Sequence, residues 1–397
     1  MPKSQLQRTL SVLIVSAFLA ACQTVPGRDE APSNCPSCPQ CPPTGETTAS
    51  PAKPLQAASW DDLPGWRDDD PVAAWPAFLQ SCRGLNGKPG WKRVCDLARS
   101  VNGKNGSAVR SFFEDHFTPY ALTVADGKRE GLITGYYEPL LRGSRSRSKT
   151  YGVPVRGVPD DLISVDLAEV VPELKNLRLR GRLQGNRVVP YYSRAEIESG
   201  TGKDKVLLWV DDAVELFFLQ VQGSGRVKLP DGSLVRLGYA DQNGHPYQSI
   251  GKVLLERGDL KVGEASMQGI QAWARANPAR LQELLNANPS YVFFRELPAG
   301  NDGPLGSLGV PLTAERSLAV DPRYVPLGAP VFLASSQPNS KTPLQRLMLA
   351  QDTGGAIKGV IRADFFWGFG AQAGEQAGRM KQSGRLWVLL PAELAPK

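Results

Sequence analysis

Short apolar runs separated by turns dominate the C-terminal part of the chain, from residue 291 to residue 390. The runs are rich in Val, Leu and Phe, and Gly, Pro, Asn or Asp stands between them. This pattern is typical of short β-strands, and it favours a closed barrel over a parallel sheet covered by helices. We predict strands at residues 291–294, 310–312, 317–320, 330–333, 344–350, 357–361 and 386–390.

Three aspartates lie in or directly after these runs. Asp321 precedes a proline, Asp352 precedes Thr-Gly-Gly, and Asp364 precedes Phe-Phe-Trp-Gly. Carboxylates at the ends of strands can be aimed into a cleft by a rigid sheet. No Cys, His or Glu stands close by in the sequence to complete a metal cage. We therefore expect acid–base chemistry, with no metal and no cofactor.

The N-terminus has the features of a lipoprotein signal peptide. Lys3 and Arg8 form a basic start, residues 12–21 are apolar but too short to span a bilayer, and two alanines precede Cys22. We predict cleavage before Cys22 and lipidation of that cysteine; the alternative is an ordinary signal peptide in which Cys22 is incidental. An aspartate after the cysteine would indicate retention at the inner membrane, so Gln23 favours the outer membrane of a Gram-negative cell, facing the periplasm.

Residues 23–59 are rich in Pro, Ser, Thr and Ala and carry no aromatic residue. Such a segment cannot bury enough apolar surface to fold, and we interpret it as a tether. It contains Cys35, Cys38 and Cys41, which are spaced like a zinc or redox motif but lack a fourth ligand and a helix N-terminus. Their role stays open between incidental and loosely disulfide-paired cysteines.

The composition excludes a nucleic-acid footprint. The formal net charge is +7, and it falls to +5 when residues 1–21 are removed. No basic run with interleaved aromatic residues occurs, whereas a mild positive charge suits an anionic polymer. The hydrophobic content of 41% is ordinary for a globular protein, and the length leaves room for two domains or one large one.

Helical spacing is clearest between residues 70 and 117. Asp70 followed by proline predicts a helix start, and apolar residues follow at helical spacing up to Cys82; residues 109–117 repeat the pattern. Cys82 and Cys95 lie on either side of a glycine-containing turn. In an oxidising envelope we expect them to form a structural disulfide.

The period of the pattern changes after residue 120. Residues 121–124 and 131–134 predict a β-hairpin around Asp126-Gly127. From residue 142 to about 288, short strands alternate with Gly- and Asp-containing turns, and two short helices close the region. We predict strands here at residues 188–189, 206–210, 216–221 and 234–238.

Several motifs occur in a fixed order along this part of the chain. They are Gly-Tyr-Tyr-Glu-Pro at 135–139, Pro-Tyr-Tyr-Ser-Arg-Ala-Glu-Ile at 190–197, Leu-Gln-Val-Gln-Gly-Ser-Gly-Arg at 219–226 and Gly-Tyr-Ala-Asp-Gln-Asn-Gly-His-Pro-Tyr at 238–247. Together with the three aspartate segments, this set resembles the membrane-bound lytic murein transglycosylase A family. The match runs from about Gly131 to the C-terminus; earlier residues resemble the family only generally.

The resemblance implies a mainly β fold with peripheral helices, of the α+β class. A double-psi β-barrel catalytic domain would carry a smaller inserted β-domain, and glycan strands would lie in the groove between them. The implied divisions are a signal peptide at 1–21, the tether at 22–59, the catalytic domain at 60–141 and 289–397, and the inserted domain at 142–288. Implied partners are peptidoglycan glycan strands and, through the lipid anchor, the membrane. Membership of complexes for cell-wall synthesis or division is left as an open alternative.

The activity implied by the resemblance is cleavage of the β-1,4 bond between N-acetylmuramic acid and N-acetylglucosamine without water. Residue by residue, the family's catalytic aspartate matches Asp364, a supporting aspartate matches Asp352, and the first of the three matches Asp321. The alternative for Asp364 is that it caps a turn. Asp352 can bond the amides of its own loop, which favours an orienting role over proton transfer. Asp321 is interpreted mainly as a turn residue, and it is kept among the candidates for glycan binding.

One carboxylate is enough for this chemistry. An ordinary glycosidase uses two, whereas here O6 of the sugar attacks the anomeric carbon and leaves a 1,6-anhydromuramoyl end. Asp364 would protonate the glycosidic oxygen and then accept the proton of O6. It must therefore hold a proton near neutral pH, and we expect desolvation by the adjoining Phe365, Phe366 and Trp367, with repulsion from Asp352, to raise its pKa.

Glycan binding should need aromatic faces and polar donors near the glycine-rich motifs. Our candidates are Tyr136, Glu138, Gln222, Ser224 and Arg226. In the predicted strand at 216–221 and its extension, Gln220 and Gln222 would share one face, and the neighbouring glycines would let a polymer approach the backbone. The alternative is that residues 222–226 form only a turn with a β-bulge.

Other functions fit the sequence less well. Asp-Thr-Gly is also the signature of aspartic proteases, but it occurs only once, and no second lobe repeats it. Ser224 lacks the spacing of a nucleophile elbow, which argues against a serine hydrolase. His116 and His245 are too few and too far apart for a metal site. The strongest alternative is a non-catalytic envelope lipoprotein that binds peptidoglycan.

Overall fold

The computed structural model describes residues 53–174, 177, 179–203, 205–300 and 302–396. All of them belong to one compact unit, Ser50–Lys397. The predicted signal peptide, Cys22 and the three tether cysteines lie outside the described residues. Among the helices that these ranges contain, none has the length and apolar character that crossing a membrane requires.

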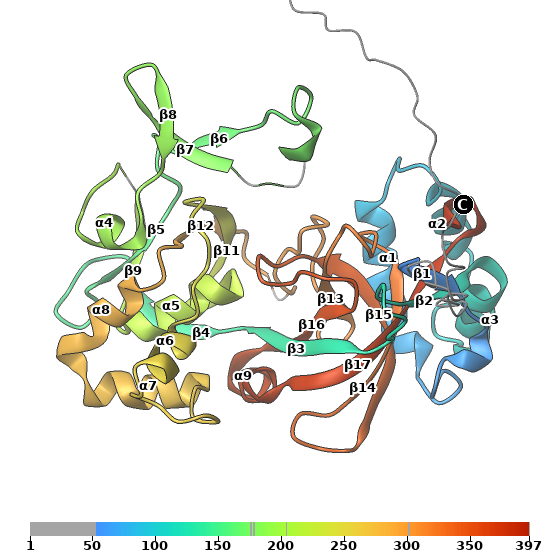
Figure 1. Ribbon diagram of the computed structural model, residues 1–397. Helices are drawn as coiled ribbons and strands as arrows, with labels where there is room; N and C mark the ends of the chain where they lie inside the picture. Colours follow the sequence, from blue (N-terminus) through green and yellow to red (C-terminus); the bar gives the residue numbers. More distant parts are fainter. Residues whose placement is uncertain (1–52, 175–176, 178, 204, 301, 397) are drawn as a thin grey trace, which may run out of the picture. The chain divides into compact units, whose positions relative to one another are not determined.

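The larger sheet has eight strands in the order β1-β2-β17-β14-β15-β13-β16-β3 (Figure 1). β3 pairs with β16 and also with β17, so the pairings of six strands return to the strand from which they start. The fold is mixed α+β and dominated by sheets, as predicted. The strands are β1 (Leu55–Ala57), β2 (Thr118–Leu122), β3 (Gly131–Glu138), β13 (Ser317–Val320), β14 (Pro330–Ser336), β15 (Pro343–Asp352), β16 (Arg362–Phe369) and β17 (Lys381–Leu390).

Four helices accompany this sheet: α1 (Trp75–Gly84), α2 (Lys92–Ala98), α3 (Gly106–His116) and α9 (Gly370–Arg379). Asp70 caps a 3₁₀ turn, Pro71–Ala74, which leads into α1, and Asn105 caps α3 by accepting a bond from the Ala108 amide. The predicted disulfide is present between Cys82 of α1 and Cys95 of α2. The aromatic residues of α1 and α3 join the apolar strand residues in the largest buried cluster.

The predicted hairpin at residues 121–134 is wrong. β2 and β3 do not pair with each other; each pairs with a different part of β17. A tight turn does form at the expected place, because the Gly127 amide donates to the carbonyl of Val124. The local turn chemistry was therefore identified correctly, but the partner of both strands comes from the far end of the chain.

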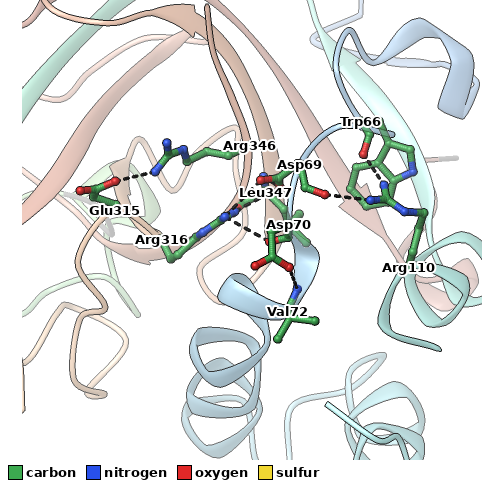
Figure 2. Close-up of polar contacts among 9 residues, drawn as sticks. All are labelled: Trp66, Asp69, Asp70, Val72, Arg110, Glu315, Arg316, Arg346 and Leu347. Atoms are coloured by element: carbon green, nitrogen blue, oxygen red, sulfur yellow. Dashed lines mark hydrogen bonds and ion pairs between the residues drawn. The ribbon is translucent and has the colours of Figure 1, made fainter. Parts of the chain in front are cut away.

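A buried ion pair connects the segment before α1 to the larger sheet (Figure 2). Arg316, which directly precedes β13, donates to both carboxylate oxygens of Asp69, each at 3.1 Å, and also to the carbonyls of Asp70 and Leu347. The Leu347 amide of β15 donates to the same carboxylate at 2.6 Å. The two side chains are only 9% and 5% exposed, so the full set of bonds compensates for their desolvation.

The rest of the chain forms two smaller sheets. One has the order β12-β11-β10-β4-β9-β5, and the other the order β6-β7-β8. The strands are β4 (Leu140–Ser144), β5 (Val153–Arg156), β6 (Ile163–Val165), β7 (Leu179–Gln184), β8 (Arg187–Pro190), β9 (Val206–Val210), β10 (Ser224–Lys228), β11 (Leu234–Gln242) and β12 (Val292–Leu297). The helices are α4 (Arg194–Glu198), α5 (Ala213–Gln222), α6 (Ile250–Glu256), α7 (Met267–Ala276) and α8 (Leu281–Asn286).

The predicted strand at residues 216–221 is part of helix α5. Asp212 caps the helix by accepting bonds from two amides of its first turn, and Gly223 ends it with φ of 79°. Leu216 packs in one buried cluster and Phe217 in another, so the helix is apolar on opposite sides. A helix buried in this way shows no polar face, and its sequence therefore resembles a buried strand.

Two further predicted strands are absent from the described residues. Residues 310–312 form a loop in which Pro311 makes an isolated bridge with Leu305. Residues 357–361 form a turn-rich connection that ends where β16 begins. Both segments still bury apolar side chains, Leu312 and Ile357 among them, which explains why their sequences looked like strands.

We expect the Asp69–Arg316 pair to be a major determinant of stability. Asp69→Ala leaves a buried guanidinium without its charge partner and should lower the free energy of unfolding by about 3–5 kcal/mol. The matched control is Arg346→Gln, which removes the more exposed pair with Glu315 in Figure 2 and should cost about 1 kcal/mol or less. Urea unfolding measures both, and similar losses in the two variants would contradict this expectation.

Candidate active site

Two of the three aspartates share one row of the larger sheet. Ala319 of β13 pairs in register with Asp352 of β15 on one side and with Asp364 of β16 on the other. Thr134 of β3 continues the row beyond Asp364. Paired residues lie on the same face of a sheet, and neighbouring strands are about 4.8 Å apart. Two strand spacings, roughly 10 Å, therefore separate the Cα atoms of the two aspartates, with a small alanine between them.

A β-bulge creates this row. The register between β13 and β15 shifts immediately before Ala319, so that Ala319 pairs with Asp352 and not with Gln351. Gln351 is buried on the other side, where its amide group donates to two oxygens of α1 and accepts a bond from Ser317. Because a shift of one residue exchanges the faces of a strand, the bulge places Asp352 on the face of Asp364.

The surroundings of Asp364 raise the pKa of its carboxyl group. Desolvation is the largest influence on its pKa and raises it to about 6. The Thr134 hydroxyl, which donates to Oδ1 at 2.6 Å, and the charge of Arg362 act in the opposite direction, and repulsion from Asp352 adds only the smallest contribution. The side chain keeps a partly accessible surface, although the atoms packed around it dominate its environment.

The apolar surroundings of Asp364 differ from the expected set. Side chains alternate along β16, so only Phe366 shares its face, while Phe365 packs in the main core and stacks with Trp367 at 4.7 Å between ring centroids. The remaining apolar groups come from other segments of the chain. The buried cluster on this face consists of Tyr136, Leu312, Ala319, Ile357 and Phe366.

Asp352 is held by three hydrogen bonds from side chains and backbone. The amide and hydroxyl of Ser307 both donate to Oδ1 at 2.9 Å, and the Tyr136 hydroxyl donates to Oδ2 at 3.2 Å. Desolvation raises the pKa of Asp352 in spite of these bonds, and it also raises that of Tyr136. A carboxylate fixed on both oxygens is suited to orienting its neighbours, and Tyr136 links it to the apolar cluster.

Asp321 organises a turn. Its side chain is fully buried and accepts bonds from the Arg323 side chain and from the amides of Arg323 and Gly359. Although desolvation opposes the change, these bonds lower its pKa to about 2. In this structure the carboxylate has its partners within the protein, which supports the interpretation as a turn residue.

Glu138 and Arg226 bind each other. Arg226 donates to Glu138 through Nε at 3.0 Å, and the two side chains are 8% and 1% exposed. The same guanidinium lies 4.3 Å from the ring centroid of Phe369 and donates to the carbonyl of Asp302, which also accepts a bond from Arg236. Burial raises the pKa of Glu138 despite these arginines. We call Glu138 and Arg226 the crossing pair, because they join the end of β3 to the segment that returns to the larger sheet.

The other two candidates for glycan binding have separate settings. Gln222 is the last residue of α5, and its side chain accepts a bond from the Tyr137 amide at 3.1 Å. Ser224 opens β10 and is half-buried. Because α5 is a helix, Gln220 and Gln222 do not share a strand face as predicted; Gln220 is buried and accepts a bond from Arg194.

Within the described ranges, no three His, Cys, Asp or Glu side chains are grouped so that they could hold a metal ion. His116 packs against Phe112 with 5.0 Å between ring centroids. His245 places Nε2 2.7 Å from the carbonyl of Tyr191. Both histidines thus have packing or hydrogen-bonding partners within the protein.

Comparison with known proteins assigns the chain to a family. Two family models match, the "MltA specific insert domain" at residues 132–295 and the "3D domain" at residues 316–390. Membrane-bound lytic murein transglycosylase A of Escherichia coli K12 is 34% identical over 296 residues, which cover 72% of this chain and 73% of that protein. The chain belongs to the membrane-bound lytic murein transglycosylase A family. The Vibrio cholerae protein of the same name is 33% identical and covers 68% of each chain.

Solved structures of the family have the same fold. MltA from Neisseria gonorrhoeae is 42% identical with a TM-score of 0.77, and the match covers 86% of this chain and 94% of that one. Escherichia coli MltA with bound chitohexaose is 28% identical with a TM-score of 0.64 and covers 87% and 97%.

Sequence reasoning missed the residues that surround the two aspartates. Thr134, Ser307 and Ala319 lie outside the aspartate segments, and no short motif marks them. Thr134 directly precedes the Gly-Tyr-Tyr-Glu-Pro motif at 135–139, which was the only local signal. Thr134 and Ala319 take their positions from strand register across the sheet, and Ser307 lies in a loop; the sequence pattern alone defines neither.

The raised pKa of Asp364 predicts a pH-dependent cost to stability. A carboxyl group with a pKa near 6 in the folded protein and a lower one in the unfolded chain stabilises the fold fully below about pH 4 and loses that contribution as pH rises through 6. Asp364→Asn should therefore be more stable than the natural protein by roughly 1–3 kcal/mol at pH 8 and about equal at pH 4. Urea unfolding at both pH values tests this, and a constant difference would contradict it.

Proposed function

We propose that the protein is a peptidoglycan lytic transglycosylase. It cleaves the β-1,4 bond between N-acetylmuramic acid and N-acetylglucosamine and leaves 1,6-anhydromuramoyl ends. Membership of the family and the likeness to a relative solved with chitohexaose support this activity. The observation that carries the proposal is the desolvated carboxyl group of Asp364, with a pKa near 6 and a hydroxyl partner on the adjacent strand.

In the proposed mechanism Asp364 acts as acid and then as base. Its proton passes to the glycosidic oxygen as the bond from that oxygen to the anomeric carbon breaks. The resulting carboxylate accepts the proton of the O6 hydroxyl as O6 bonds to the same carbon, which regenerates the acid without water. A pKa near the working pH serves both steps, because neither protonation state is strongly disfavoured.

Asp352 has an orienting role in this proposal. Its oxygens are occupied by Ser307 and Tyr136, so it holds the loop around Ser307 and the aromatic ring against the face that carries Asp364. Tyr136 would in turn offer the edge of its cluster to the sugar. For Gln222 and Ser224, contact with the glycan remains part of the proposal. The mutual bonding of the crossing pair supports a structural role for Glu138 and Arg226.

The finer architecture is also proposed. The closed cycle of strand pairings supports a six-stranded barrel, and the double-psi connections and the division into 60–141 with 289–397 and an inserted domain at 142–288 rest on the family resemblance. The two smaller sheets support an inserted domain, but the six-stranded one also contains β4, from Leu140, and β12 (Val292–Leu297), so its bounds extend beyond 142–288. The sequence around Cys22 supports a lipid anchor in the outer membrane, and the membrane-bound relatives agree with an envelope location. The anchor would keep the catalytic part next to its polymer.

The activity is tested on murein sacculi with protein that lacks residues 1–22. We expect 1,6-anhydromuropeptides, identified by mass, and a loss of at least about 10²-fold in kcat for Asp364→Asn. Asp352→Asn should lose about 10-fold to 10²-fold through misplacement of the site. Products with reducing ends would indicate a hydrolase, and absence of products with retained binding would favour a glycan-binding protein.

The two variants also test the assignment of roles. Both should fold like the natural protein, because asparagine keeps the shape of the side chain. Its oxygen can accept the bonds that Thr134 or Ser307 donates, and at position 352 its amide nitrogen would donate to the Tyr136 hydroxyl in place of accepting from it. Full activity of Asp364→Asn together with an inactive Asp352→Asn would reverse the proposed roles.

A further inference from the structure

A small cavity of about 190 Å³ lies within the α4–α5–α8 region, away from the aspartate row in the sequence. Its lining combines apolar side chains with three polar ones, Arg194, Glu198 and Gln282. The volume is below the roughly 300 Å³ of a drug-sized site, so it suits a ligand of a few heavy atoms. The lining residues that matter below are Val153, Arg194, Glu198, Leu216, Gln282 and Leu285.

The guanidinium of Arg194 is buried and rigidly held. The residue is 3% exposed, and its carbon Cζ lies 4.8 Å from the ring centroid of Phe217 and 4.9 Å from that of Tyr291. Nε donates to the carbonyl of Asn288 at 3.1 Å. Nη2 donates to the carbonyl of Ser290 and to the side chain of Gln220. These bonds use one edge of the guanidinium and fix its plane.

The other nitrogen, Nη1, is not held by these bonds, and Arg194 lines the cavity. Its ion-pair partner is Glu198 at 3.9 Å, which is beyond hydrogen-bonding distance, and Glu198 lines the same cavity. Within the part of the chain that the structure describes, no hydrogen bond is formed by Nη1. An arginine keeps its charge, so Nη1 remains a charged donor for an acceptor that enters the cavity. The geometry is that of a prepared anion site.

We propose that this cavity binds the carboxylate of a small aliphatic residue, such as a terminal alanine. A carboxylate oxygen is the acceptor that a fixed guanidinium recognises best, and the apolar wall of Val153, Leu216 and Leu285 would take a methyl group. The same chemistry is offered by the end of a short peptide and by a free amino acid. Assignment to the peptides of the cell wall rests on the proposed function; recognition of the carboxylate does not.

Glu198 sets the strength of the site. Its carboxylate lies beside Arg194 and competes with an incoming carboxylate for the same charge. Replacing it by glutamine removes the repulsion and should strengthen binding. Gln282 lies at the exposed rim on α8, where a larger side chain would close the entrance without disturbing the core.

Binding is measured by isothermal titration of the protein with D-alanyl-D-alanine, with free D-alanine and with D-alanyl-D-alaninamide. We expect saturable binding of the dipeptide and at least a tenfold weaker interaction with the amide, which lacks the carboxylate. Glu198→Gln should tighten binding of the dipeptide several-fold. The matched control Glu256→Gln, which changes an exposed glutamate outside the cavity, should leave binding unchanged.

Two variants test the site directly. Gln282→Trp should abolish binding of the dipeptide, while Glu283→Trp, next to it but outside the lining, should not. Arg194→Met should also abolish binding. Because this change removes the bonds to residues 288–290, circular dichroism is used to check that the variant folds. If it unfolds, the Gln282 and Glu198 variants alone decide whether the cavity binds the carboxylate.

The outcomes separate the sources and the two proposals. Tighter binding of the dipeptide than of D-alanine assigns the site to peptide ends, and the reverse assigns it to free amino acids; both support the carboxylate site. The carboxylate site is overturned if the amide binds as tightly as the dipeptide, or if Gln282→Trp still binds the dipeptide. It is also overturned if no binding is detected at about 10 mM ligand, which corresponds to a binding free energy of roughly −3 kcal/mol. Sacculus digestion is measured separately, so that active protein without carboxylate binding overturns this inference alone.

Discussion

The site depends on one extra residue in the pairing of β13 with β15. The bulge before Ala319 turns Asp352 towards the face of Asp364 and sends Gln351 into the core. Burying an amide side chain is unfavourable unless its donors and acceptor are bonded, and here Ser317 and two oxygens of α1 meet that requirement. The position of a carboxylate on one face is therefore maintained by a polar network on the other.

Opposing influences then set the state of Asp364. Desolvation alone favours the neutral acid, whereas the Thr134 hydroxyl and the charge of Arg362 favour the carboxylate. The balance lies near neutral pH, where a group can give and take a proton with little driving force in either direction. A fully buried carboxyl without these partners would keep its proton, and an exposed one would lose it. The adjacent strand thus tunes the group through a single hydroxyl.

The sequence predicted the parts of the fold whose signals are local. Most strands of the larger sheet, the helix start at Asp70 and the pairing of Cys82 with Cys95 follow from short patterns. Two strands were missed: β1 (Leu55–Ala57) lies in the segment predicted to be a tether, where pairing with β2 orders it, and β16 lies just after the strand predicted at 357–361. Helix α5 was missed because burial on opposite sides removes its polar face. The β2–β3 hairpin failed because β17, more than two hundred residues away in the chain, pairs with both strands. In the site, the sequence identified the aspartates but not their partners, because Thr134 reaches Asp364 through long-range strand pairing and Ser307 reaches Asp352 from a loop.

The crossing pair has a consequence for motion in the protein. Glu138 lies where the chain leaves the larger sheet. Arg226 binds Glu138 and also donates to the carbonyl of Asp302, which lies on the segment that returns to the larger sheet. Separating the end of β3 from β10 would strand two desolvated charges, a penalty of several kcal/mol. Both segments are therefore expected to move together as one stiff joint. Any motion that admits or releases a polymer would therefore have to come from other parts of the protein, such as surface loops.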